Sequence, residues 1–217
     1  MHEIELKLTA DGGATLDRVL RCALVRRLDT GVGAADAVHY HGLYYDTDDN
    51  ALERSGRSLR ARREGERWRA ACKFAGAIEH GLSSRRELEA DIAGELDCAA
   101  QLPDGELKDR ILEVIAADAP LHVRVRVDMR RSIRNLLLDD DGDVSDGVGV
   151  SVELVADRGV IHGRSEQVAL HEIELELKSA QSPAAIAAVM SLGARLARDF
   201  ALTPSTRSKR RIGLELG

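Results

Sequence analysis

The chain of 217 residues has few cysteines and few aromatic side chains. Its three cysteines, Cys22, Cys72 and Cys98, lie far apart and form no CxxC pair, so the sequence indicates neither a disulfide framework nor a cysteine-based zinc site. Aromatic residues account for only 3% of the chain. A binding cavity built from this composition must therefore rely mainly on charge.

Long apolar segments are also absent from the sequence. The most apolar stretch, 184–197, is interrupted by Ser191 and Arg195 and is too short to span a membrane. The acidic N-terminus lacks the apolar core of a secretory signal. A formal net charge of −6 makes attraction to nucleic acid or to an anionic membrane unexpected. We therefore expect a soluble, cytoplasmic, reduced protein with no nucleic-acid or membrane partner.

Several common site motifs are missing as well. The sequence has no Walker-type phosphate loop, no GxSxG nucleophile motif and no Cys/His pair. The acidic segment 139–149 is predicted as a turn. It superficially resembles a calcium loop, but Val144 and Val150 stand where such a loop needs Gly and Glu.

Charged residues are abundant, at 31% of the chain, and they alternate with apolar ones. In the first strand-like run the charged residues Glu3, Glu5 and Lys7 alternate with the apolar residues Ile4, Leu6 and Leu8. In a strand, residues i and i+2 share a face, so this run has one charged and one apolar face. Charged faces of the same kind recur along the chain at Arg60 and Arg62, Arg69 and Lys73, Glu87 to Asp91, Arg124 to Arg130, Glu153 and Asp157, and Glu172 to Lys178.

Two architectures fit this alternation. In the first, a packed apolar interior is surrounded by a solvated, charged exterior, which is the usual arrangement for any single strand. In the second, the charged faces line a cavity and the apolar faces lie under helices. The repetition over seven strands favours the second.

The spacing of turns and apolar residues predicts about eight strands and three helices in a single domain of residues 1–217. Further strands are expected at 42–46, 59–64, 67–74, 86–92, 122–138, 150–156, 171–177 and 209–216. Helices are expected at 16–28, 107–117 and 183–199, the last capped by Ser182 and opened by Pro183. Loops are expected at 29–39 and 76–84.

The charge pattern also predicts chemistry. The carboxylates of Glu172, Glu174 and Glu176 recur about every 7 Å along one strand face and repel one another unless a cation neutralises them. Hard divalent cations take such oxygen ligands, and magnesium typically adds substrate phosphates to a few carboxylates. Arginine forks on other strands match phosphate oxygens. A closed barrel with these carboxylates on one wall and the arginines on another would bind a metal and a polyphosphate together.

In these features the chain resembles the CYTH superfamily, the triphosphate tunnel metalloenzymes, over nearly its whole length. The run Glu3-Ile4-Glu5-Leu6-Lys7 matches the ExExK signature of that family. Further matches are Tyr45-Asp46-Thr47 with Leu52, 59–62, Lys73, 86–89, 124–126, Glu153 with 157–159, 172–178 and Ser208-Lys209. The resemblance implies a mainly β fold, an eight-stranded antiparallel closed β-barrel that forms a tunnel with a charged interior and flanking helices.

The resemblance further implies a divalent-metal-dependent enzyme, using Mg2+ or Mn2+, that acts on a small-molecule triphosphate. The chain looks most like the bacterial inorganic triphosphatases, which often carry a C-terminal helical CHAD domain that is missing from this sequence. On this basis Glu3, Glu5, Glu172 and Glu174 would bind the principal metal, and Glu153 and Glu176 would support that metal or a second one. The phosphates would be bound by Lys7, Arg60, Arg62, Lys73, Arg124, Arg126, Lys178 and Lys209.

The catalytic roles are expected to fall on Lys7 and on Glu87 or Glu89, either of which could orient the attacking water. Two alternatives stay open. One is an adenylate cyclase of class IV type, or a nucleoside or thiamine triphosphatase, within the same fold. The other is a non-catalytic polyphosphate-binding module, although binding phosphate alone needs few carboxylates.

Overall fold

The computed structural model describes residues 2–79, 82–138 and 149–217, so nearly all of the predicted turn at 139–149 lies outside the described residues. Within these ranges the chain forms ten strands and six α-helices. The strands are β1 (His2–Thr9), β2 (Ala35–Asp46), β3 (Arg57–Glu64), β4 (Arg67–Phe74), β5 (Ala77–Glu79), β6 (Leu82–Ile92), β7 (His122–Leu138), β8 (Val150–His162), β9 (Gln167–Leu177) and β10 (Thr203–Pro204). The helices are α1 (Gly13–Arg21), α2 (Ala23–Leu28), α3 (Ala51–Arg54), α4 (Glu106–Leu112), α5 (Pro183–Phe200) and α6 (Lys209–Leu214), with a 3-10 turn at Ala99–Gln101.

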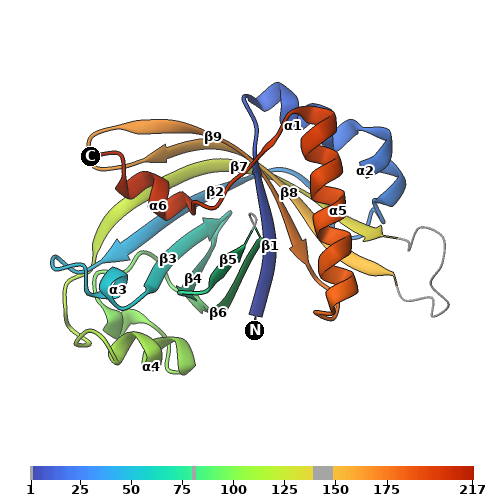
Figure 1. Cartoon of the computed structure of the whole chain (residues 1–217). Coiled ribbons are helices and arrows are strands. Elements are labelled where there is room, and N and C mark those ends of the chain that lie inside the picture. Colours follow the sequence, from blue (N-terminus) through green and yellow to red (C-terminus); the bar gives the residue numbers. More distant parts are fainter. Residues whose placement is uncertain (1, 80–81, 139–148) are drawn as a thin grey trace.

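Eight of the strands close into a ring. Their order is β1-β9-β8-β7-β2-β3-β4-β6, and β6 pairs again with β1, every pairing being antiparallel. The short strands β10 and β5 add to β1 and β6. The predicted closed eight-stranded antiparallel barrel is therefore confirmed (Figure 1).

Helices cover two apolar outer faces of the ring. On one side α1, α2 and α5 pack on Ile4 of β1 and Ile173 of β9, both of which are buried. On another side α3, α4 and the 3-10 turn pack on Leu59 of β3 and Cys72 of β4. Figure 1 shows α5 beside β1 and α4 at the opposite side of the barrel. Because these apolar residues lie outside, the alternate charged residues point inward, as the strand pattern predicts.

Several elements differ from the sequence expectation. The helix expected at 16–28 is interrupted at Cys22, whose extended backbone ends α1 and whose Sγ accepts a hydrogen bond from Val25 N at 3.4 Å to begin α2. Strand β2 starts at Ala35, in the expected loop 29–39, because its pairing with β7 orders this polar segment. The expected loop 76–84 contains β5 and the start of β6. The cap of α5 is confirmed, since Ser182 Oγ accepts from Ala185 N.

The C-terminal segment 209–216, predicted as a strand, is mainly helix α6. Ser208 caps this helix, because its Oγ accepts a hydrogen bond from Arg211 N at 3.1 Å. Ile212 and Leu214 pack against Val125 and its apolar neighbours on β7. The physical reason for the difference is the closure of the ring, which leaves no free edge for a further long strand.

Within the described residues, no helix is both long and apolar enough to cross a membrane.

Candidate functional site

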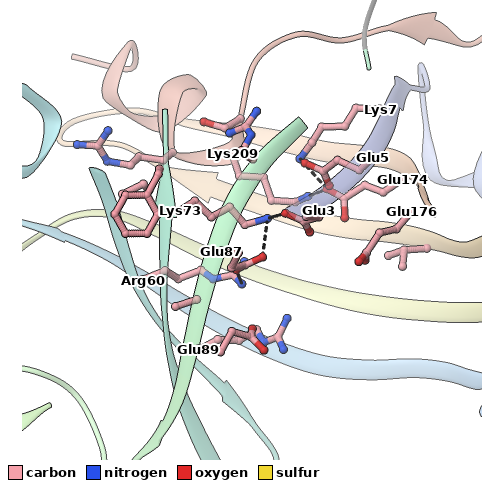
Figure 2. A pocket seen from close by; sticks show the side chains of 18 of the residues that line it. Glu3, Glu5, Lys7, Arg60, Lys73, Glu87, Glu89, Glu174, Glu176 and Lys209 are labelled. Carbon is pink, nitrogen blue, oxygen red and sulfur yellow. Dashed lines mark hydrogen bonds and ion pairs between the residues drawn. The ribbon is translucent and has the colours of Figure 1, made fainter. Parts of the chain in front are cut away.

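The barrel encloses a cavity of about 1190 Å³ whose wall is mostly charged (Figure 2). Most of the predicted site residues line it, namely Glu3, Glu5, Lys7, Arg60, Arg62, Lys73, Glu87, Glu89, Glu153, Glu174, Glu176, Lys178 and Lys209. Glu172 is fully buried beside this wall. Arg124 and Arg126 are the predicted residues that lie elsewhere.

Three carboxylates form a row across adjacent strands. In the sheet register Glu5 of β1 lies opposite Glu176 of β9, and Glu176 lies opposite Glu153 of β8. Lys178 approaches two of them, with Nζ 2.7 Å from Glu176 Oε1 and 3.4 Å from Glu153 Oε1. Burial, together with the carboxylates of Glu3 and Glu153, raises the pKa of Glu176 to about 6 although Lys178 opposes the rise. Lys7 Nζ lies 3.2 Å from Glu5 Oε1, so the three carboxylates of this row face two lysines.

A second acidic group lies deeper in the wall and is occupied by a lysine. Oxygen atoms of Asp157, Glu172 and Glu174 lie within 4.8 Å of one another. Lys209 Nζ is 3.0 Å from Asp157 and 2.8 Å from Glu174, and it also contacts Glu172. Lys7 Nζ adds a contact of 2.9 Å to Glu174. A metal ion at this place would have to displace the Lys209 ammonium group.

Protonation in this deeper group differs between its members. Burial opposes ionisation of Asp157 and Glu174, but the surrounding cations outweigh it and hold the pKa of both carboxyls below the ordinary value. Burial raises the pKa of Glu172 to about 7, even though Lys209 and Lys7 counteract it. Glu172 Oε2 is buried without a hydrogen-bond partner, which agrees with a carboxyl that takes up a proton readily.

Sequence reasoning missed Arg131 of β7, which is a partly buried member of the same network. Its guanidinium group donates two hydrogen bonds to Asp157, of 2.8 and 2.7 Å, and a third of 3.2 Å to Glu174. It also lies over the ring of Tyr40, at 5.3 Å, while Arg62 lies over that ring at 5.0 Å. The strand pattern did contain a signal, because Arg131 has the same parity as the buried Val125.

The basic wall is formed by β3 and β4. Lys73 Nζ lies 2.6 Å from Glu3 and 3.3 Å from Glu87, and Arg60 Nη2 lies 3.7 Å from Glu87. Burial and the nearby guanidinium groups of Arg60 and Arg131 lower the pKa of Arg62. Arg60, Arg62 and Arg131 thus hold three guanidinium groups near one another, an arrangement that suits an anion.

The two predicted water-orienting residues lie on β6 facing this wall. Glu87 contacts Lys73 and Arg60, as given above, whereas Glu89 Oε2 is 3.4 Å from Arg69 Nη1. Glu87 is therefore closer to Glu3 and to the acidic side of the cavity, since Lys73 bridges the two (Figure 2).

The expectation that Arg124 and Arg126 face the cavity is wrong. Arg126 is exposed on the outer wall, and Arg124 donates a hydrogen bond to Thr47 O, at 2.7 Å, beside the end of β2. Inside the barrel this half of β7 is apolar, because Val125 and Met129 pack with α6. The expectation assumed that every charged face points inward, but a helix packed on the inner face of β7 reverses that order.

The sequence profile of the CYTH domain matches residues 1–199 of this chain. Several solved structures are similar to this chain, and three of them follow. HpAC1 from Hippeastrum, an adenylyl cyclase candidate described as having a dominant triphosphatase activity, is 17% identical with a TM-score of 0.65, covering 95% of this chain and 92% of that chain. The PH1819 protein from Pyrococcus horikoshii OT3 is 17% identical with a TM-score of 0.55, covering 97% and 98%. A Bacillus halodurans protein described as an adenylate cyclase candidate is 16% identical with a TM-score of 0.53, covering 95% of each chain. At these identities the likeness establishes the fold alone.

Proposed function

Because the chain belongs to the CYTH family, we propose that it is a divalent-metal-dependent hydrolase that cleaves inorganic triphosphate to diphosphate and phosphate inside the barrel. The observation that carries this proposal is the pairing of an acidic row with a wall of arginines and lysines in one cavity. The acids suit a cation and the arginines suit phosphate oxygens, so together they suit a metal-bound polyphosphate.

The acidic row fits a divalent ion. Glu5 and Glu176 lie opposite each other and offer hard oxygen donors, and the carboxylates of Glu3 and Glu153 are close enough to raise the pKa of Glu176 in addition to its burial. We propose Glu3, Glu5, Glu153 and Glu176 as ligands of Mg2+ or Mn2+. Glu172 and Glu174, which the sequence favoured as principal ligands, are better suited to hold Lys209 and Lys7. When bound, the metal would neutralise phosphate charge and orient a water molecule.

The residues of the chain then supply positioning and charge. Arg60, Arg62 and Lys73 would bind the phosphoryl oxygens, and Lys7 and Lys209 would stabilise charge that develops on the leaving diphosphate. Glu87 is the better placed of the two candidate carboxylates to accept a proton from the attacking water, since it lies beside both Arg60 and Lys73.

A second candidate function is the turnover of an organic triphosphate. Cavities of about 300–1,000 Å³ accommodate drug-sized ligands, and this cavity of about 1190 Å³ has room for a nucleoside beside three phosphates. Tyr40, Tyr44 and Phe74 are the aromatic residues that line it. The description of HpAC1 as both a cyclase candidate and a triphosphatase keeps this possibility in view.

The deciding experiment is a side-by-side measurement of kcat/KM for inorganic triphosphate, ATP and thiamine triphosphate with Mg2+ and with Mn2+. We expect inorganic triphosphate to be cleaved in clear preference, because the wall is mainly ionic and aromatic contacts are few. Equal or faster turnover of ATP, or release of cyclic AMP, would select the second function. Binding of triphosphate without hydrolysis under both metals would identify a polyphosphate-binding module instead.

Substitution of one inward-facing arginine should weaken substrate affinity. Arg60→Ala removes a charge-assisted contact worth about 1.5–3 kcal/mol, so the KM for triphosphate should rise roughly 10- to 150-fold. Arg60→Lys should recover only part of this loss because it keeps the charge without the fork. Arg126→Ala is the matched control, since it removes the same charge from the outer wall and should leave KM unchanged. An equal effect of both alanine variants would contradict the assignment of the basic wall.

A further inference from the structure

Lys209 reaches the buried acids from a helix too short to hold itself in place. Helix α6 has six residues, Lys209–Leu214, and isolated helices of that length are unstable in water. Yet the Lys209 side chain is among the most buried of the cavity, with 6% of its surface exposed. Contacts from elsewhere must therefore fix the start of α6.

Apolar packing supplies one of these contacts. Ile212, Leu214 and Leu216 cover the inner face of β7, and Gly213 lies so close to it that a Cβ at this position would clash with Val125 Cγ1. Such packing holds the helix against the strand. Because the hydrophobic effect has no direction, packing alone does not set the position of α6 to within the fraction of an ångström that a lysine contact requires.

A directional contact comes from the residue after Lys209. Arg210 Nη2 donates a hydrogen bond of 3.0 Å to Asp46 Oδ2. Asp46 ends β2 and is completely buried. Its two oxygens also accept hydrogen bonds from the backbone N–H groups of Thr47, Leu52 and Glu53, at 2.9, 2.9 and 3.0 Å. These bonds orient the carboxylate rigidly, so Asp46 is a fixed anchor for Arg210.

We propose that Asp46 and Arg210 are a positioning pair that places Lys209 in the phosphate-binding cavity. Asp46 does not line the cavity, so it acts through Arg210 and the first turn of α6. The pair links the β2–α3 turn to the C-terminal helix, and the neighbouring Glu53 Oε2 lies 3.7 Å from the same guanidinium group. This inference rests on the proposed function only in assigning Lys209 to the substrate phosphates.

Arg210 itself lines the cavity, so a direct contact with substrate has to be separated from positioning. Asp46→Asn makes the separation, because it keeps the side-chain shape and removes the charge that orients Arg210. If Arg210 positions Lys209, losing this charge should raise the KM for triphosphate. If Arg210 binds phosphate directly, freeing it from Asp46 should leave KM unchanged or lower it.

The experiment measures triphosphate kinetics and amide hydrogen exchange for Asp46→Asn, Arg210→Ala, Arg210→Lys and the double variant of Asp46→Asn with Arg210→Ala. We expect a roughly 10- to 100-fold loss in kcat/KM for Arg210→Ala, mainly through KM, because small displacements of binding groups have effects of this size. Arg210→Lys should restore part of it, and the double variant should be no worse than either single one. Amides of α6 should exchange faster while those of β9 stay protected.

Arg207→Ala is the control, since Arg207 is exposed and contacts only the surface residue Glu215 among the ion pairs found in the described residues. Parent values of KM and of α6 exchange in Arg210→Ala would overturn the inference, and so would an unchanged KM in Asp46→Asn beside a raised one in Arg210→Ala. If Asp46→Asn does not fold, the inference is tested by the two Arg210 variants alone. It then requires faster amide exchange of α6 in Arg210→Ala and partial recovery of kcat/KM in Arg210→Lys. If the parent protein fails to hydrolyse triphosphate, the proposed function is wrong. The effect of Asp46 and Arg210 on the position of α6 is then judged from amide exchange of α6 alone.

Discussion

Glu176→Gln should lose hydrolysis by roughly 100-fold or more and yet make the metal-free protein more stable. Substitutions outside the direct ligand set of a metal already cost about 10- to 100-fold, so removal of a ligand should cost at least as much. Without metal, however, the Glu176 carboxylate is partly buried near Glu3 and Glu153, and its pKa is raised from 4.5 to about 6. The neutral amide of the variant removes the unfavourable free energy of holding this partly buried charge near two other carboxylates.

The sign of the pH dependence follows from the raised pKa. Below pH 4.5 the carboxyl is protonated in both the folded and the unfolded chain, so parent and variant should be equally stable. Between pH 4.5 and 6 the unfolded chain ionises first, which disfavours the folded parent. Above pH 6 the full penalty of about 2 kcal/mol remains. Denaturation in EDTA from pH 4.5 to 8 should show the variant gaining its advantage over this interval.

Added Mg2+ or Mn2+ should reverse the order, because only the parent offers the complete ligand set. Glu166→Gln, at an exposed acid in the connection between β8 and β9, is the matched control and should change neither activity nor the metal response. If Glu176→Gln kept parent activity and parent metal dependence, the acidic row would not be the metal site.

Lys209→Met should destabilise the protein by about 3–5 kcal/mol near pH 8, the usual cost of leaving buried charges without their partner. Methionine retains most of the side-chain volume, but Asp157, Glu172 and Glu174 lose the ammonium group that they share. Lys178→Met is the control. Its side chain is more exposed, so its loss should cost about 1 kcal/mol or less.

Two measurements test the cause of this loss. The stability gap should narrow as pH falls toward about 7, since the loss of Lys209 raises the pKa of Glu172 further and the folded variant takes up a proton before the folded parent does; below that pH both proteins carry the proton and the gap should level off. Millimolar Mg2+ or Mn2+ should also narrow it, because the three oxygens, within 4.8 Å of one another, can then accept a cation. Equal stabilities of Lys209→Met and Lys178→Met at pH 8 would show that the acids do not depend on Lys209.

The alternation of charge was sufficient to predict the barrel and most of its inner wall. Period-two patterns report which residues share a face, so Glu3, Glu5 and Lys7 are correctly grouped from sequence. The pattern does not report which face is inside. That choice depends on what packs against each face, and for β7 it is decided by α6, a helix about 80 residues further along the chain.

Structural features that depend on tertiary contacts could not be predicted from the alternation of charged and apolar residues. The segment at Lys209 alternates well enough to suggest a strand, but the closed ring offers it no edge, and Ser208 provides a helix cap. Arg131 shares the parity of the buried Val125, but its pairing with Asp157 on β8 depends on a strand register that the local pattern does not contain. The surroundings of Lys209 also depend on tertiary contacts. It lies among Asp157, Glu172 and Glu174, and from the sequence the two glutamates were expected to bind a metal instead.

Closure of the ring through β1 also affects the risk that the chain aggregates while it is being synthesised. Residues 2–6 of β1 can pair with β6 early, but residues 5–9 pair with β9, which ends at Leu177. At about 5–20 residues per second, translation needs on the order of ten seconds or more to deliver that partner. Throughout this interval one edge of β1 is open, and open edges recruit foreign strands. The charges at Glu3, Glu5 and Lys7 discourage such pairing, so the residues that suit the finished tunnel to a polyphosphate also protect the nascent chain from aggregation.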